Sequence, residues 1–229
     1  MVISRVGRVC LSDKGGRDGR LRSFAKATIV CPSKTRSQAE STALVHREVT
    51  AVYVDQSTKT MFAVFTTPRT MPPSSSVCAY RLTDIEDVFK GPFYTSNGEP
   101  TKFNNANDCE KSNLPTTSLE HHQMYRTVRP KLDQSIMRKE KVRWSNLVVD
   151  WMPTTLKTDN NLILFTVDPD RQIISKWHHF KGETCLIEEL RVLRTPPRTA
   201  DTDGERVLRL ELIRAGQAKE VRNTSFNVG

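Results

Sequence analysis

The stretch Ser76-Val-Cys-Ala-Tyr-Arg-Leu-Thr-Asp-Ile-Glu-Asp-Val-Phe-Lys-Gly-Pro-Phe93 changes character near its middle. Its first part, Val77–Leu82, is rich in β-branched and aromatic residues, which favour a strand. In its second part, Thr83–Phe89, Thr83 stands at the position of a helix N-cap and Glu86 follows three residues later, which is the spacing of a capping box. The stretch therefore predicts a strand followed by a short helical turn.

Short β-branched and aromatic runs continue on both sides of this stretch, and helical periodicity is scarce. That pattern is typical of an all-β domain built from many short strands. The predicted strands are Ile3–Val9, Ala27–Cys31, Thr50–Val54, Met61–Thr66, Val77–Leu82, Asn146–Asp150, Leu162–Val167, Gln172–Lys176, Leu186–Leu193 and Val207–Ile213.

Residues that reverse the chain stand between these runs. Two groups of strand–turn–strand units, Val49–Leu82 and Leu147–Leu193, each predict one antiparallel sheet, as a propeller blade requires. Between them, from about Lys90 to Lys141, the chain is polar and lacks apolar periodicity, so it predicts a functional insertion or a partly disordered stretch. The predicted turns are Asp13-Lys-Gly-Gly16, Asp55-Gln-Ser57, Pro72-Pro73 and Asp168-Pro-Asp170.

The charge balance favours an anionic partner only in general terms. The 229 residues include 35 Lys and Arg against 26 Asp and Glu, a formal net charge of +9. Such a charge suits nucleic acid, an anionic membrane or a sulfated polysaccharide. The cations are interleaved with acids and no nucleic-acid-binding motif accompanies them, so we expect a solvated basic surface and no nucleic acid as partner.

The titratable pairs give no sign of an enzyme, a metal site or a cofactor. His121-His122 and His178-His179 are adjacent pairs, which point to opposite faces of an extended chain, and no carboxylate or thiol stands at ligand spacing. Glu188 and Glu189 alternate across a predicted strand, so they cannot line one acid–base site. No serine or cysteine stands in a catalytic signature. We therefore expect a non-catalytic protein.

Five cysteines, at positions 10, 31, 78, 109 and 185, are too far apart for the Cys-x-x-Cys pairs of zinc and redox sites. Their spacing is compatible with long-range disulfides or with buried free thiols. The odd count leaves at least one thiol unpaired within the chain.

Several of these stretches resemble semaphorins. Arg5-Val-Gly-Arg-Val-Cys-Leu-Ser-Asp-Lys-Gly-Gly16 is similar to the strand and Asp-x-Gly-Gly turn of that family, and Phe24-Ala-Lys-Ala-Thr-Ile-Val-Cys31 resembles the strand that follows. The Ser76–Phe93 stretch, preceded by Val64-Phe-Thr-Thr67 and a Ser-rich loop, resembles the most specific element of the family. Val142–Asp150 and Leu186–Leu193 look most like the class 5 semaphorins.

The resemblance, which spans about residues 3 to 193, implies an all-β fold that is a partial seven-bladed β-propeller, a sema domain, with about blades four to six and a long insertion. Two or three blades alone leave unpaired strand edges, so we expect the isolated chain to have low stability and to aggregate. The implied boundaries are the end of blade four at 3–31, blade-five strands at 45–93, an extrusion-like insertion at 90–141, blade six at 142–193, and a divergent start of blade seven or a tail at 194–229.

The resemblance also implies site residues. Semaphorin cysteines pair first with fourth and second with third, which gives Cys10–Cys109 and Cys31–Cys78 here and leaves Cys185 over. The basic run Arg138-Lys139-Glu-Lys141 aligns with a stretch that semaphorins present to plexin, with Lys139 as the first choice. An exposed cation there would raise the association rate and fix the register of the complex more than it would raise the affinity. The alternative is that the run is an ordinary solvated loop. Asn223-Thr-Ser225 is a glycosylation sequon, which has meaning in a secreted chain.

The resemblance implies an extracellular guidance ligand that binds a plexin-type receptor through its propeller and forms homodimers in its full-length form. The alternatives are a glycosaminoglycan-binding extracellular module, a receptor-side sema domain and a non-functional gene-model fragment. The chain itself shows no apolar run that would cross a bilayer and no signal-peptide order at its start. The resemblance implies that the full-length parent protein is extracellular or lies on the extracellular side of a membrane.

Overall fold

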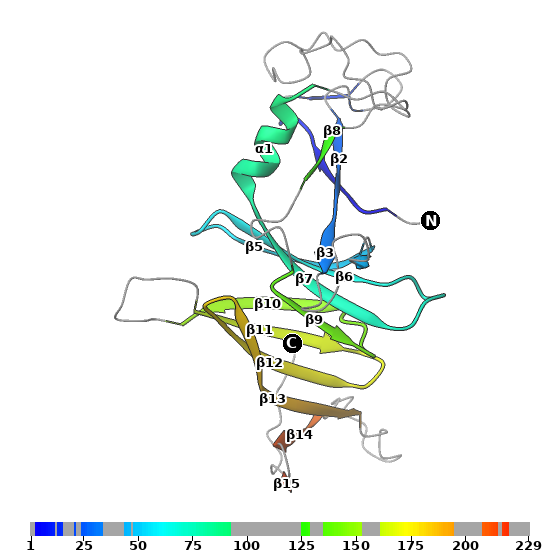
Figure 1. The fold of residues 1–229 in the computed structure, drawn as a ribbon, viewed down its shortest axis with the longest axis vertical. Coiled ribbons are helices and arrows are strands. Elements are labelled where there is room, and N and C mark those ends of the chain that lie inside the picture. The colour runs from blue at the N-terminus through cyan, green and yellow to red at the C-terminus, as the bar shows by residue number, and fades with distance from the viewer. Residues whose placement is uncertain are drawn as a thin grey trace, which may run out of the picture.

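The chain folds as β-sheets, with one helix in its described part. The computed structural model describes residues 3–11, 13–15, 21, 24–33, 44–46, 48–92, 125–128, 135–152, 161–194, 208–214 and 217–219. Figure 1 shows that the three larger sheets follow one another along the longest axis. We refer to them as the N-terminal sheet, the central sheet and the C-terminal sheet.

The central sheet is antiparallel and has the order β5-β6-β7-β9. The C-terminal sheet is antiparallel and has its six strands in chain order, from β10 to β15. The strands of these two sheets are β5 (Glu48–Asp55), β6 (Thr60–Thr66), β7 (Ser74–Arg81), β9 (Met137–Glu140), β10 (Asn146–Trp151), β11 (Leu162–Asp168), β12 (Ile173–Phe180), β13 (Glu183–Arg194), β14 (Leu208–Arg214) and β15 (Gln217–Lys219).

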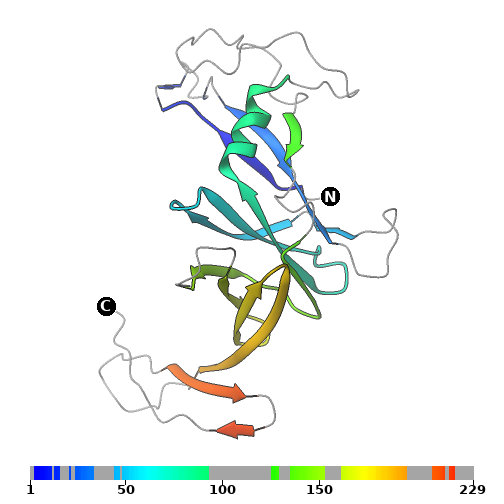
Figure 2. The same ribbon diagram turned by 60° about the vertical axis from the view of Figure 1, so that its left-hand side comes forward.

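The N-terminal sheet has the order β1-β2-β8, in which β8 runs parallel to β2. A two-stranded sheet, β3-β4, follows β2 along the chain. Figure 2 shows the central sheet between the N-terminal and C-terminal sheets from a second direction. These elements are β1 (Arg5–Arg8), β2 (Ala25–Ile29), β3 (Cys31–Ser33), β4 (Leu44–His46), β8 (Tyr125–Val128) and α1 (Leu82–Lys90).

Strand β6 shows why the central sheet lies in the middle. All seven of its residues, Thr60–Thr66, are buried. Because successive side chains of a strand point to opposite faces, a strand without exposed residues needs cover on both faces. Met61, Ala63 and Phe65 belong to a core shared with the N-terminal sheet and α1, while Phe62 and Val64 belong to a core shared with the C-terminal sheet.

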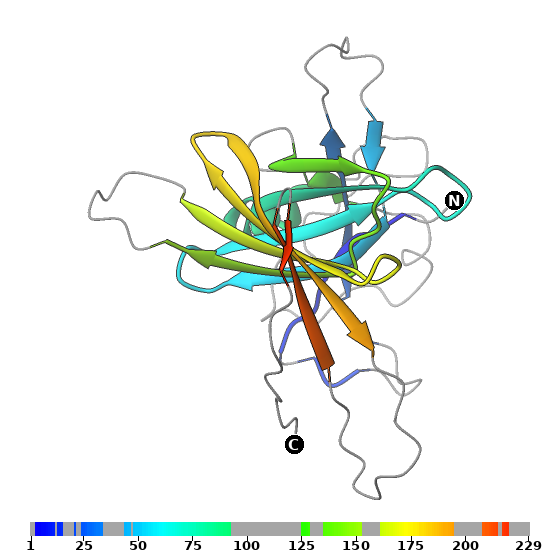
Figure 3. The ribbon, with the colours of Figure 1, turned by 90° about the horizontal axis from the view of Figure 1, so that it is seen from below.

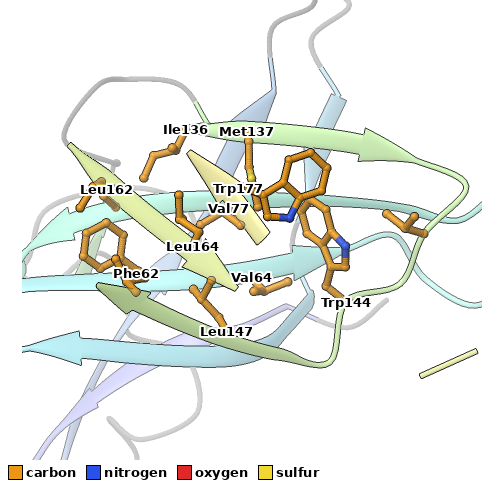
Figure 4. Close-up of a cluster of buried hydrophobic side chains, with 13 residues drawn as sticks. Phe62, Val64, Val77, Ile136, Met137, Trp144, Leu147, Leu162, Leu164 and Trp177 are labelled. Atoms are coloured by element: carbon orange, nitrogen blue, oxygen red, sulfur yellow. The ribbon is translucent and has the colours of Figure 1, made fainter. Parts of the chain in front are cut away.

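The second core joins two sheets that are separate in the hydrogen-bond network. Its largest side chains are Trp144 and Trp177, whose rings meet edge to face with centroids 5.8 Å apart. Figure 4 shows both rings among aliphatic side chains from the central and C-terminal sheets. The labelled members of this core are Phe62, Val64, Val77, Ile136, Met137, Trp144, Leu147, Leu162, Leu164 and Trp177.

Asp55 adds a polar link between the same two sheets. Its carboxylate accepts hydrogen bonds from the Ser57 amide at 2.9 Å and from the Ser57 and Thr58 hydroxyls at 2.7 and 2.6 Å. The indole Nε1 of Trp151, on β10, donates to it at 2.5 Å. Burial alone would raise the pKa of Asp55, but these hydrogen bonds stabilise the anion and the net pKa is lowered. The predicted Asp55-Gln-Ser57 turn therefore also fixes β10 against β5.

The predicted strands are confirmed, with ends that differ by a few residues. Ala27–Cys31 divides into the end of β2 and the start of β3, and the other nine predictions each overlap one strand. The structure adds four short strands that the sequence did not predict: β4, β8, β9 and β15. Of these, β8 and β9 lie within the 90–141 segment, and β9 completes the central sheet by pairing with β7.

The predicted capping box at Thr83 is wrong. Helix α1 begins at Leu82 with Arg81 in the N-cap position, extended and without a side-chain cap. The helix follows β7 without a turn. The Leu82 amide donates to the Lys59 carbonyl at 2.9 Å, so the turn between β5 and β6 satisfies the first free amide of the helix. Thr83 therefore lies inside the first turn of the helix.

Candidate functional site

Two of the predicted disulfide cysteines are joined in the structure. Cys31 on β3 and Cys78 on β7 form a disulfide with their Cα atoms 5.7 Å apart, and both residues are fully buried. Cys10 is buried and disulfide-bonded, whereas Cys109, the partner implied for it, lies outside the described residues. Cys185 is an exposed free cysteine on β13. The Cys31–Cys78 bond ties the β3-β4 sheet to the central sheet.

A buried polar cluster lies beside this disulfide. His46, which pairs with Cys31 across β3 and β4, is 1% exposed. Its Nε2 lies 3.1 Å from Ser74 Oγ and its Nδ1 lies 3.2 Å from Ser76 Oγ, so both ring nitrogens are satisfied by hydroxyls. Burial, and secondarily the positive charge of Arg138, lowers the pKa of His46 to about 4. His46 is therefore neutral at pH 7.

This shift predicts a pH-dependent stability. His46 keeps its folded pKa near 4, whereas the unfolded chain takes up the proton near pH 6.5, so the free energy of unfolding falls as the pH is lowered through that window. We expect His46 to account for a loss of roughly 2 kcal/mol between pH 7 and pH 4.5. Urea unfolding of the unaltered chain and of His46→Gln at both pH values measures this loss of free energy of unfolding.

The variant should lose stability at pH 7, because the two hydroxyls lose their partner, and should show a flatter pH dependence. The slope that remains would include His179, whose pKa is also lowered, by burial and by the charge of His178. A His46→Gln variant with the same pH slope as the unaltered chain would contradict the assignment to His46.

The structure does not bring the three predicted receptor-binding cations to one surface. Arg138 and Lys139 are consecutive residues of β9, so their side chains point to opposite faces of the central sheet. Arg138 pairs across from Ser76 and its Nη2 bonds Glu140 Oε1 at 3.1 Å. Within the described part of the chain its buried Nε and Nη1 atoms have no hydrogen-bond partner.

Lys139, the first choice from the sequence, is directed at the C-terminal sheet. Its ammonium lies 3.0 Å from Glu189 Oε1 and 4.9 Å from the centre of the Trp177 ring. Glu189 also accepts a hydrogen bond from Ser175 Oγ at 3.3 Å. The side chains of Lys139 and Glu189 are 30% and 18% exposed, so this pair is partly screened from water. The contacts make Lys139 an inter-sheet link.

Lys141 differs from both. It is exposed, it follows the end of β9, and its backbone has a φ of 61°. Its amide donates to the Pro73 carbonyl at 2.7 Å, which fixes the residue beside the loop that joins β6 to β7. Of the basic run, Lys141 therefore offers the most accessible cation.

The adjacent histidine and glutamate pairs of the C-terminal sheet each have separate partners. His179 Nδ1 lies 2.7 Å from Thr184 Oγ1, and His178 Nε2 contacts Asn161 Oδ1, so the two rings have separate partners. Glu188 pairs with Lys176 while Glu189 turns to Lys139, which places the two carboxylates on different faces. Across the described ranges, no group of three His, Cys, Asp or Glu side chains is arranged to hold a metal ion.

Some predicted residues lie outside the described residues: Cys109, Asn223 and the His121-His122 pair. Sequence reasoning missed the Lys139–Glu189–Trp177 contacts, because no local pattern links positions 139, 177 and 189. No helix among the described residues is long and apolar enough to span a membrane.

Comparison with known proteins agrees with this architecture. A model of the Sema domain family matches residues 43–202. Semaphorin-1A of Drosophila melanogaster is 27% identical over 257 residues, a match that covers 100% of this chain and 28% of the relative. Human Semaphorin-5B is 30% identical over 224 residues, covering 86% of this chain and 18% of the relative. The chain therefore spans only 18% to 28% of the length of these relatives.

Solved structures show the same fold. Drosophila Semaphorin 2a superposes with a TM-score of 0.65 at 22% identity, over 93% of this chain and 37% of that chain. A chain from the complex of Drosophila Plexin A with Semaphorin 1b also gives a TM-score of 0.65, at 21% identity, over 96% of this chain and 48% of that chain. The structure is part of a sema-type β-propeller, and because the family model matches more than half of its residues, the chain belongs to the Sema domain family.

Proposed function

We propose that this chain is part of an extracellular semaphorin-type ligand that binds a plexin receptor through its propeller and has no catalytic role. The observation that carries the proposal is the family match over residues 43–202, which contains the central sheet and most of the C-terminal sheet. Two solved structures with the same fold support it: a complex of Drosophila Plexin A with Semaphorin 1b, and the extracellular domains of Drosophila Semaphorin 1a.

Within that proposal, Lys141 takes the part that the sequence assigned first to Lys139. A receptor contact needs a cation that can reach an acidic group on the partner, and the Lys139 ammonium already pairs with Glu189. Lys141 is exposed beside it. Arg138 and Lys139 would act behind it, since Arg138 bonds Glu140 and Lys139 links β9 to β13. Exposed charges of this kind raise the association rate more than they change the dissociation rate.

The test is binding of the chain to an immobilised plexin ectodomain, measured by surface plasmon resonance. We expect saturable binding, and we expect Lys141→Glu to slow association by about tenfold, because it reverses a charge at the interface. Lys181→Glu is the matched control, since Lys181 is also an exposed lysine with positive φ, 49° against 61° for Lys141. That control should stay within about twofold of the unaltered chain.

Two outcomes would count against this function. Lack of binding by the unaltered chain would remove plexin as partner. Retention on heparin that falls steeply with salt, together with receptor binding that both reversals weaken equally, would favour the glycosaminoglycan-binding module instead.

A further inference from the structure

The loop between β6 and β7, residues 67–73, is exposed from Arg69 to Pro73 and is held in place by hydrogen bonds. The amide of Thr67 donates to the Ser74 carbonyl at 3.0 Å, and the amide of Met71 donates to the Pro68 carbonyl at 2.9 Å. The hydroxyl of Thr67 donates to the Pro72 carbonyl at 2.7 Å and accepts from the Ser74 amide at 3.1 Å. The loop therefore closes on itself through backbone and hydroxyl hydrogen bonds.

Arg143 clamps this loop from outside. Its guanidinium donates to three carbonyl oxygens of the loop: that of Thr67, that of Pro68 at 3.1 Å and that of Met71 at 2.9 Å. A planar guanidinium with five donors suits such convergent acceptors. Hydrogen bonds from a charged donor are stronger than neutral ones, so the clamp limits how far the loop moves.

The loop at residues 67–73, which we call the clamped loop, carries several side chains that are exposed to solvent. Arg69 and Thr70 are exposed, Met71 is 45% exposed, and Pro72 and Pro73 follow on the surface. Figure 3 shows the β6–β7 loop extending beyond the stacked sheets. Residues 67–73 include no Asp or Glu, and the carboxylate of nearby Glu140 pairs with Arg138. The surface is thus apolar and cationic.

Because the loop is already held in one conformation, it is suited to binding a partner. Binding a mobile loop costs conformational entropy, whereas a loop already held in one conformation avoids most of that cost. Protein interfaces are enriched in aromatic residues, methionine and arginine, and arginine is also frequent among the residues that contribute most to binding. A methionine and an arginine at the tip of a clamped loop fit that description, and Lys141 adjoins them through its hydrogen bond to Pro73.

We propose that the clamped loop and Lys141 together form a contact surface for an acidic, partly apolar protein surface on the receptor. Arg143 is the positioning residue of the loop. This inference rests on the proposed function and adds residues to it. A sulfated polysaccharide would engage Arg69 and Lys141 but would gain little from Met71, so the methionine separates a protein partner from a polysaccharide.

The experiment compares two matched pairs of variants in the plexin binding assay. Met71→Ser is paired with Met152→Ser, because each methionine is 45% exposed and Met152 lies at the end of β10, away from the loop. Arg69→Ala is paired with Arg171→Ala, since both arginines are exposed residues of turns. We expect Met71→Ser and Arg69→Ala each to weaken binding by about tenfold, and the controls by less than about twofold.

Arg143→Lys tests the clamp itself. Lysine keeps the positive charge but cannot donate to three carbonyls at once. We expect faster hydrogen exchange at the Met71 amide and binding weakened by about fivefold, while exchange in β6 stays unchanged.

The outcomes are separable. Binding that is kept by Met71→Ser and Arg69→Ala would overturn the clamped loop and leave the proposed function standing. No binding by the unaltered chain would overturn both. Loss with Arg69→Ala but not with Met71→Ser, together with a matching loss of heparin retention, would assign the loop to a polysaccharide and overturn the protein contact.

Discussion

Replacing Cys31 and Cys78 together by serine is expected to lower the free energy of unfolding by about 4 kcal/mol. The disulfide closes a loop of 47 residues, and a cross-link of that span removes many conformations from the unfolded chain. The same bond holds the β3-β4 sheet, and with it His46, against β7. Denaturant unfolding under non-reducing conditions, followed by circular dichroism, measures the loss.

Cys185→Ser is the matched control, because it also removes a thiol but from an exposed, unbonded position. We expect that control to change the free energy of unfolding by less than about 0.5 kcal/mol. Equal stability of the double variant and the control would mean that Cys31 and Cys78 are not joined in solution. Addition of a reductant to the unaltered chain should reproduce much of the loss seen in the double variant.

Trp144→Ala is expected to cost about 4 kcal/mol. Trp144 is 1% exposed, although it precedes β10 and lies outside any strand. Its indole fills the core between the central and C-terminal sheets, and its backbone is held there as well. Its amide donates to Ser75 Oγ at 3.1 Å, and its carbonyl accepts from Thr50 Oγ1 at 2.7 Å. Removal of the ring therefore leaves a cavity that the fixed backbone cannot close.

Two further variants show whether the loss comes from the cavity. Trp144→Phe keeps part of the ring contact with Trp177 and should cost about half as much. Val148→Ala truncates an exposed side chain of β10 and should cost less than about 0.5 kcal/mol. Calorimetry of the three variants checks the order. A cost of less than about 1 kcal/mol for Trp144→Ala would show that the ring does not hold the two sheets together.

Local sequence patterns were sufficient for the strands that have a regular apolar content. Val77–Leu82 and Met61–Thr66 are β-branched and aromatic, and both lie in the central sheet. Strand β9 could not be predicted, because Met137-Arg-Lys-Glu140 has the composition of a solvated turn. Its conformation depends on pairing with β7, which lies far away in the sequence. The start of α1 was missed for a similar reason, since a distant carbonyl replaces the local cap.

The candidate site was predictable only in part. The charge of the run at 138–141 is evident from the sequence, but the direction of each side chain follows from the register of β9. That register turns Arg138 toward His46 and Lys139 toward Glu189. Likewise, Arg143 is one basic residue among many in the sequence. Its role in holding the loop at residues 67–73 depends on three backbone carbonyls, which leave no trace in composition.

The late position of β9 in the chain has a consequence for synthesis on the ribosome. The central sheet receives β5, β6 and β7 in immediate succession, but its fourth strand begins only at Met137, more than fifty residues after β7 ends at Arg81. At a translation rate of about 5 to 20 residues per second, the outer edge of β7 stays unpaired for roughly 3 to 12 s. The nascent chain therefore passes through a stage in which Cys31 and Cys78 can already meet while the sheet still lacks its edge strand β9. Oxidation in that interval would secure the partial sheet before its last strand arrives.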